Sequence, residues 1–261
     1  MSIQDISSAV AALRRAEATR TPRGRLTREW EGLDLDTAYR VQNALVEERV
    51  AAGETVVGIK LGLTSRAKQE RMGISSPLTA VLTDAYILPA DVPVPLDRLI
   101  QPRAEPELVF VMGQPLRGPG VTAATALAAV DRVYGGFEII DSRYVDYDFG
   151  LPDVVADNAS SAFFVVGGVG RRPDELDLAL EAVVLSVGGD VVDTATGAAV
   201  QGHPAEALAL AANALCARGQ EIPAGAIVLT GGLTDAIALT PGASLAAEFT
   251  HLGTVHLSVE R

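Results

Sequence analysis

The sequence is poor in cysteine, lysine, aromatic residues and long apolar runs. Its single cysteine, Cys216, has no partner for an intramolecular disulfide, which is typical of proteins in a reducing compartment. No stretch approaches the roughly 18 apolar residues of a membrane-spanning helix. The first residues, MSIQDISSAVAALRRAE, contain no apolar segment of the kind that forms a secretion signal. We therefore expect a cytoplasmic protein with no membrane association.

Positive charge is also scarce, since the formal net charge is −12 and the pI is about 4.7. The arginines are scattered and alternate with acids or turn residues, so no basic patch is predicted. A polyanion would be repelled by such a surface. We therefore expect no nucleic acid partner. The 261 residues suffice for one large domain or two small ones, with a core built mostly from aliphatic side chains.

Periodicity and turn residues divide the chain into a helical beginning and a strand-rich remainder. Helices are predicted at 3–19, 35–52, 122–133 and 204–218, and strands at 56–63, 79–87, 105–112, 137–141, 162–167, 179–187, 190–194, 226–230 and 253–259. Helices do not alternate regularly with strands, which favours an α+β fold with a mixed, barrel-like sheet. We expect an N-terminal helical subdomain over 1–54 and a β-rich catalytic domain over 55–261.

One of only two lysines lies inside an apolar strand, VVGIKLGLTS at 56–65. Because side chains alternate across a strand, Lys60 shares its face with Gly58 and Gly62. Neither glycine has a side chain, so space is expected beside the ammonium, and a ligand is one candidate to occupy it. The alternative is a lysine on an edge strand, placed there to discourage aggregation.

Two glutamates, Glu105 and Glu107, are predicted to share a face of the strand that contains QPRAEPELVF. Adjacent carboxylates repel in a low dielectric unless a proton or a cation neutralises them. Glu138, in the apolar segment FEIID, is a third candidate, and three carboxylates without histidine or cysteine suit Mg²⁺ or Mn²⁺. The alternative is a solvated strand face. Pro106 donates no ladder bond, which predicts an edge strand or a bulge.

The remaining polar segments give weaker predictions. Residues 142–164 are expected to form an ordered loop, and the Gly-Gly end of VLTGG at 228–232 could bind an anion through backbone amides. Ordinary turn chemistry is the alternative for both segments, and the sequence alone favours it. His203 is predicted to cap a helix or line a turn. No catalytic arrangement can be assembled from the three histidines, so a histidine-based nucleophilic mechanism is not supported.

Taken together, GIKLGLTS, QPRAEPELVF, FEIIDSRY, VVADNASS, QGHPAEALALAANAL and IVLTGG resemble the fumarylacetoacetate hydrolase-like superfamily over nearly the whole chain. The closest similarity is to its branch of 2-oxo-acid decarboxylases and hydratases from meta-cleavage degradation of aromatic compounds. The resemblance implies the superfamily's catalytic-domain fold and an Mg²⁺ or Mn²⁺ ion. The residues that match the family's metal ligands, active-site lysine and substrate contacts are Glu105, Glu107, Glu138, Lys60, Ser160, Thr230 and Gly231.

Leu78 decides which reaction the resemblance favours. Hydratases of this branch tend to carry an acid at this position, after the strand that contains GLTS, whereas the decarboxylases carry an aliphatic residue. The expected reaction is therefore loss of CO₂ from 2-oxohex-3-enedioate to give 2-hydroxypenta-2,4-dienoate, with Lys60 attracting the dianion and Leu78 in an apolar wall. The alternatives are the hydratase of 2-hydroxypenta-2,4-dienoate, an acylpyruvate-type C–C hydrolase, and a non-catalytic partner subunit. The resemblance also implies a homo-oligomer and a complex with the pathway hydratase.

Overall fold

A computed structural model describes residues 3–261, apart from the side chains at positions 3, 4, 67, 68 and 71. The chain begins with two helices, α1 (Ile3–Thr19) and α2 (Leu35–Ala51). Asp34 caps α2, because its carboxylate accepts a 2.8 Å hydrogen bond from the backbone nitrogen of Thr37. Both helices end close to the predicted positions.

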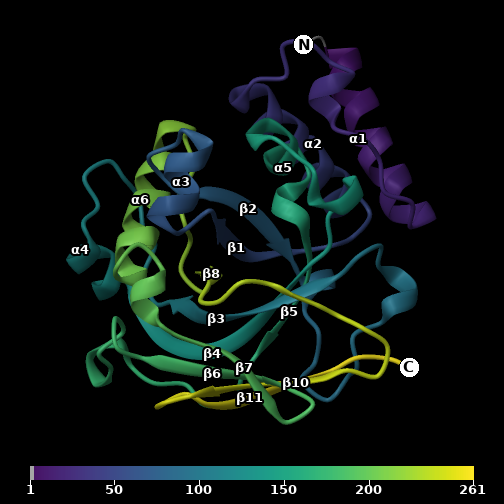
Figure 1. The fold of residues 1–261 in the computed structure, drawn as a ribbon. Helices are drawn as coiled ribbons and strands as arrows, with labels where there is room; N and C mark the ends of the chain where they lie inside the picture. The colour runs from purple at the N-terminus through teal and green to yellow at the C-terminus, as the bar shows by residue number, and fades with distance from the viewer. Residues whose placement is uncertain (1–2) are drawn as a thin grey trace.

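A curved sheet of seven strands forms the centre of the molecule (Figure 1). Its main path runs β2-β1-β8-β3-β4-β5, with β9 paired to β3. The strands of this sheet are β1 (Val56–Gly62), β2 (Leu78–Thr83), β3 (Arg103–Met112), β4 (Val130–Ile140), β5 (Ser161–Val166), β8 (Ile227–Gly232) and β9 (Ile237–Ala238). Only β1 and β8 are parallel to each other, and the other pairs are antiparallel. The expectation of an α+β fold with a mixed, barrel-like sheet is confirmed.

A second, four-stranded sheet in the order β11-β10-β6-β7 lies against one face of the first (Figure 1). It consists of β6 (Ala182–Val187), β7 (Asp190–Thr196), β10 (Ser244–Phe249) and β11 (Gly253–Ser258). The predicted Gly-Gly hairpin is its β6–β7 pair. The main hydrophobic core fills the space between the two sheets and reaches helix α6 (Pro204–Ala217). Even-numbered residues of β3, such as Leu108 and Phe110, point into this core.

The N-terminal helices pack with α5 (Leu151–Ala156) over the β2 end of the large sheet (Figure 1). This second hydrophobic cluster contains Leu13 of α1, Leu45 of α2 and Val155 of α5, together with Leu78 of β2. It therefore covers one end of the sheet face that is turned away from the main core. Whether residues 1–54 form a separate subdomain stays a prediction. Within the described range, no helix is long and apolar enough to cross a membrane.

Several predicted elements were wrong in extent. The helix predicted at 122–133 ends early, as α4 (Ala123–Ala128), and strand β4 begins at Val130. The segment Val130–Ile140 pairs with β3 on one side and with β5 on the other. The hydrogen bonds and packing of this strand pairing outweigh the local helix propensity. The loop predicted at 142–164 contains α5 and the start of β5, and α3 (Arg66–Met72) and β10 were not predicted.

Pro106 lies in an interior strand, so the prediction of an edge strand was wrong. β3 pairs with β4 on one side and β8 on the other. The predicted bulge is confirmed, since the register with β8 shifts between Glu107 and Val109. Pro106 needs no amide donor at this irregularity, and its carbonyl accepts a 2.9 Å hydrogen bond from the backbone nitrogen of Leu233.

Candidate active site

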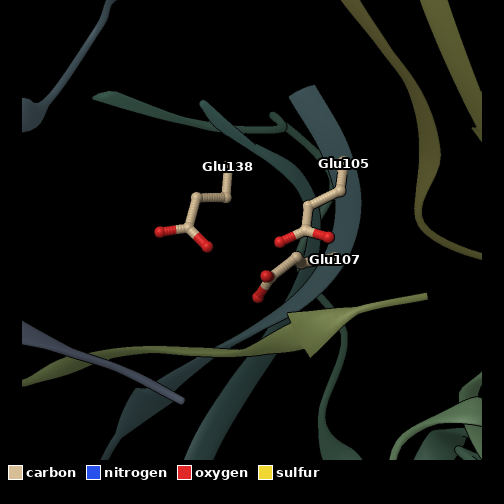
Figure 2. A group of neighbouring side chains, drawn as sticks. All are labelled: Glu105, Glu107 and Glu138. Atoms are coloured by element: carbon tan, nitrogen blue, oxygen red, sulfur yellow. The ribbon is translucent and has the colours of Figure 1, made fainter. Parts of the chain in front are cut away.

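The three glutamates singled out in the sequence meet on one face of the large sheet. Glu105 and Glu107 are two residues apart in β3, and Glu138 of β4 is the direct cross-strand partner of Glu105. One carboxylate oxygen from each residue lies within 4.8 Å of the others. Figure 2 shows the three carboxylates turned toward a common space between the two strands. Strand register, rather than any loop, therefore sets their spacing.

Burial makes this cluster electrostatically costly. Glu107 is fully buried and Glu138 is 1% exposed, whereas Glu105 is partly exposed. Burial raises the pKa of Glu107 well above its ordinary value, and the negative charges of Glu138 and Glu105 raise it further. Burial also raises the pKa of Glu138, although Lys60 opposes that shift. The solvated strand face considered as an alternative is thus excluded by the structure.

Lys60 places a positive charge in contact with the cluster. It lies on β1, an interior strand between β2 and β8, and is 4% exposed. Its Nζ is 2.9 Å from Oε1 and 3.1 Å from Oε2 of Glu138, so the ammonium sits astride that carboxylate. The edge-strand explanation of Lys60 is therefore wrong. One cation cannot neutralise three carboxylates, and a net negative charge remains.

The Gly-Gly end of β8 shapes the glutamate pair. The backbone nitrogen of Gly231 donates a 2.7 Å hydrogen bond to Oε2 of Glu107. A Cβ on Gly232 would lie 2.1 Å from Oε2 of Glu105, and a Cβ on Gly231 would lie 2.1 Å from Oγ1 of Thr64. Both glycines are therefore needed for space, and Gly231 also for its φ of +110°. The sequence had indicated this turn as an anion site but not its contact with the glutamates.

Apolar side chains from four strands line the same face of the sheet beyond the cluster. Leu82 of β2, Leu229 of β8, Val109 of β3 and Phe164 of β5 form a separate buried group with Tyr86. Leu229 is the neighbour of Lys60 across β1 and β8, and Phe164 is the neighbour of Glu138 across β4 and β5. The charged cluster therefore adjoins a low-dielectric floor, which strengthens electrostatic interactions within it.

The space expected at Gly58 and Gly62 is filled by the protein, whereas a ligand at the Lys60 ammonium itself stays a prediction. A Cβ on Gly58 would lie 1.9 Å from the carbonyl oxygen of Ile227, and one on Gly62 would lie 2.5 Å from Cδ1 of Leu78. Leu78 is paired with Gly62 and is 3% exposed. The aliphatic residue singled out in the sequence therefore packs two strand positions from Lys60, on the same face.

The donor set is suited to a hard divalent cation. All three groups offer carboxylate oxygens, the ligands preferred by Mg²⁺ and Mn²⁺. Oε1 of Glu107 is buried without a hydrogen-bond partner, and Oε1 of Glu138 is buried 2.9 Å from the Lys60 ammonium. Buried acceptors are rarely left without a partner in proteins. A cation between the strands would provide one and relieve the repulsion among the carboxylates.

Two further residues predicted to contact substrate are fixed by the protein. The Oγ of Ser160 lies 3.3 Å from Oδ2 of Asp157, which is itself ion-paired with Arg143. Thr230 directs its hydroxyl to the carbonyl of Leu108, at 2.9 Å. Ser160 ends a run of three left-handed residues that begins at Asn158, a strained conformation typical of functional segments. The roles of Ser160, Thr230 and Gly231 in substrate binding stay predictions.

A large cavity lies elsewhere in the described part of the chain. Its volume is about 830 Å³, and its lining includes Ile59 and Val81, on the sheet face opposite Lys60. Further lining residues come from α2 and from the segment between α6 and β8. It contains none of the three clustered glutamates, so we assign the chemistry to the carboxylate cluster rather than to this cavity.

Comparison with known proteins identifies the family to which this architecture corresponds. The model of the fumarylacetoacetate (FAA) hydrolase C-terminal family matches residues 55–260. A 4-oxalocrotonate decarboxylase of Pseudomonas sp. (strain CF600) is 41% identical over 231 residues, covering 88% of each chain. A 2-hydroxyhexa-2,4-dienoate hydratase of Comamonas testosteroni is 40% identical over 219 residues, covering 83% of each chain. The resemblance expected from the motifs is confirmed.

The solved structures agree with the sequence comparison. The 4-oxalocrotonate decarboxylase from Pseudomonas putida G7, complexed with magnesium and adipate, superposes with a TM-score of 0.96. It is 36% identical, and the match covers 98% of both chains. The similarity therefore includes the helices that precede residue 55 as well as the two sheets.

Proposed function

The chain belongs to the FAA hydrolase family, and within it we propose that this lyase removes CO₂ from 2-oxohex-3-enedioate (4-oxalocrotonate). The product would be 2-hydroxypenta-2,4-dienoate. The observation that carries the proposal is the cluster of three inward-facing carboxylates beside a buried lysine, bordered by Leu78 and an apolar floor. A role in meta-cleavage degradation of aromatic compounds follows from that substrate.

Glu105, Glu107 and Glu138 would hold Mg²⁺ or Mn²⁺, which supplies Lewis-acid polarisation of a 2-oxo acid when bound. The amide of Gly231 orients Glu107 for this task through its 2.7 Å hydrogen bond. The register of β3 and β4 holds the other two carboxylates opposite each other. The chain therefore provides a preorganised site that needs no loop closure to bring its ligands together.

Lys60 would bind the substrate dianion and stabilise negative charge that develops on its 2-oxo oxygen. Cleavage of the C5–C6 bond releases CO₂, and the electron pair moves through the C3–C4 double bond to that oxygen. The ammonium of Lys60 then gives its proton to the oxygen and regains one from solvent, so that charge and atoms balance. Its 3.1 Å or shorter contacts with Glu138 keep the ammonium at the site before substrate enters.

The apolar surroundings favour decarboxylation over hydration. Leu78 is buried at the position where an acid would assist proton handling in a hydratase. The leaving carboxylate becomes an uncharged molecule, so an apolar wall stabilises the transition state relative to the charged ground state. The same wall provides no base to activate a water molecule.

Parallel assays of the two candidate substrates test this proposal. The purified protein is incubated with Mg²⁺ and either 2-oxohex-3-enedioate or 2-hydroxypenta-2,4-dienoate, with and without a chelator. We expect CO₂ release from the first substrate, its loss on chelation, and no consumption of the second. Rapid loss of the dienoate without CO₂ release would instead establish the hydratase, the alternative favoured by the similarity to hydratases. Light scattering of the protein, alone and mixed with the pathway hydratase, tests the expected homo-oligomer and complex.

A further inference from the structure

Three turns with left-handed backbone meet around Thr64, beside the carboxylate cluster. Leu63 has a φ of +54°, Gln201 of +55° and Gly231 of +110°. The backbone nitrogen of Gln201 donates a 3.0 Å hydrogen bond to the carbonyl of Thr64. The hydroxyl of Thr64 occupies the space where Gly231 would carry a side chain, and Gly231 in turn holds Glu107. Gln201 is thus fastened to the turn that borders the site.

Gln201 combines two unfavourable features. Its backbone is left-handed, which is uncommon for a residue with a long side chain. It is 7% exposed, and its Nε2 is buried without a hydrogen-bond partner. By contrast, Gln42, which is 3% exposed, donates from Nε2 to the carbonyls of Thr79 and Val155, at 3.1 and 3.0 Å. An unsatisfied, strained residue next to a site indicates a partner outside the protein.

We propose that Nε2 of Gln201 donates a hydrogen bond to a carboxylate oxygen at the metal-chelating end of the bound 2-oxo acid. The inference rests on the proposed function in that it requires such an acid at the cluster. A neutral amide suits this place, because an acid would repel the substrate and a lysine or arginine would compete with the metal for the carboxylates. Gln201 is therefore a substrate-binding residue that sets affinity and orientation.

The test compares Gln201→Met with the matched control Gln42→Met. Each variant is titrated with oxalate, which presents the same adjacent oxygens as a 2-oxo acid, in saturating Mg²⁺ by calorimetry, and its thermal unfolding is recorded without ligand. We expect Gln201→Met to bind oxalate about 10- to 100-fold more weakly, the range for one hydrogen bond to a charged group. Its melting temperature should stay unchanged or rise, because Nε2 makes no hydrogen bond within the protein. Gln42→Met should melt earlier and bind oxalate like the wild type.

Unchanged oxalate affinity in Gln201→Met would overturn the proposal, as would a melting temperature that falls as it does in Gln42→Met. If Gln201→Met is insoluble, Gln201→Asn replaces it in the test. Asparagine tolerates a left-handed backbone, and its side chain is one methylene shorter, which moves the amide away from the ligand. This variant should also bind oxalate more weakly than the wild type. If the wild-type protein binds Mg²⁺ and oxalate but turns over neither candidate substrate, the proposed function is refuted while the role of Gln201 in binding is not. If the wild-type protein binds no oxalate, both the proposed function and the role of Gln201 are refuted.

Discussion

Replacing Glu107 by glutamine tests separately how the carboxylate cluster affects folding stability and how it affects Mg²⁺ binding. Glu107 is fully buried, and its pKa is raised well above the ordinary value by burial and by the charges of Glu138 and Glu105. Burial and these charges favour the protonated carboxyl, which the uncharged amide of Glu107→Gln imitates. One amide oxygen can still accept the hydrogen bond from Gly231. The variant should thus fold with little change in stability without metal.

The distances within the cluster give the size of the effect on metal binding. Two unit charges no more than 4.8 Å apart repel by at least about 3.5 kcal/mol at an effective dielectric constant of about 20. Ionising Glu107 beside two charged neighbours would therefore cost about 7 kcal/mol, which a divalent cation offsets. If the lost attraction to the cation is comparable to one such charge pair, Glu107→Gln should weaken Mg²⁺ binding by at least about 100-fold.

Thermal unfolding with and without Mg²⁺ measures this change. At 100 times its dissociation constant, Mg²⁺ stabilises the wild type by about 2.7 kcal/mol, which raises the melting temperature of a protein of this size by about 5–10 °C. At the same concentration, Glu107→Gln should shift by about 1 °C. Glu181→Gln is the matched control, because Glu181 is 1% exposed, bonds to His251 and lies outside the cluster. A full Mg²⁺ shift in Glu107→Gln, or its unfolding without metal, would refute the reasoning.

Three other perturbations test separate parts of the site. Lys60→Met should lower kcat at least about 100-fold, whereas its Mg²⁺ affinity should be kept or increased because the ammonium contacts Glu138 but is not a metal ligand. Kinetics and calorimetry on one preparation measure both quantities, and near-normal turnover would contradict the role of Lys60. Gly232→Ala removes no metal ligand but should weaken Mg²⁺ binding in calorimetry, because the new Cβ would displace the Glu105 carboxylate. Wild-type Mg²⁺ affinity in this variant would mean that the close approach of Gly232 to Glu105 does not matter for metal binding. Because the pKa of Glu107 is raised in the folded protein, the metal-free protein should lose stability as pH rises above the ordinary glutamate pKa, whereas Mg²⁺ affinity should increase with pH. Titrations in buffers of different ionisation enthalpy should then show proton release on Mg²⁺ binding, and buffer-independent heats would oppose this.

Alternation along single strands could be predicted from the sequence, and it placed Glu105 beside Glu107 correctly. The pairing of Glu105 with Glu138 could not, because cross-strand register depends on contacts far apart in the chain. Glu138 was a candidate because it is an acid inside an apolar strand, and the family resemblance then matched all three glutamates to the family's metal ligands. Lys60 was identified by its rarity, yet its interior strand followed only from the sheet order.

The missed features have physical causes of the same kind. The alanine-rich segment before Val130 favours a helix locally, but strand pairing on both sides of β4 determines the outcome. Glycines at 58, 62, 231 and 232 looked like open space or turn signals, whereas each accommodates a neighbouring atom. Gln201 carries no signal in the sequence, since its buried and unpartnered amide exists only in the folded chain.

A crystal structure of the protein grown with Mg²⁺ and oxalate would test the central claim most directly. We predict one cation bound by oxygens of Glu105, Glu107 and Glu138 at about 2.0–2.1 Å, with oxalate completing its coordination and Lys60 within hydrogen-bonding distance of the oxalate. Well-ordered density for the three side chains with no cation among them, at Mg²⁺ concentrations that support turnover, would contradict the account.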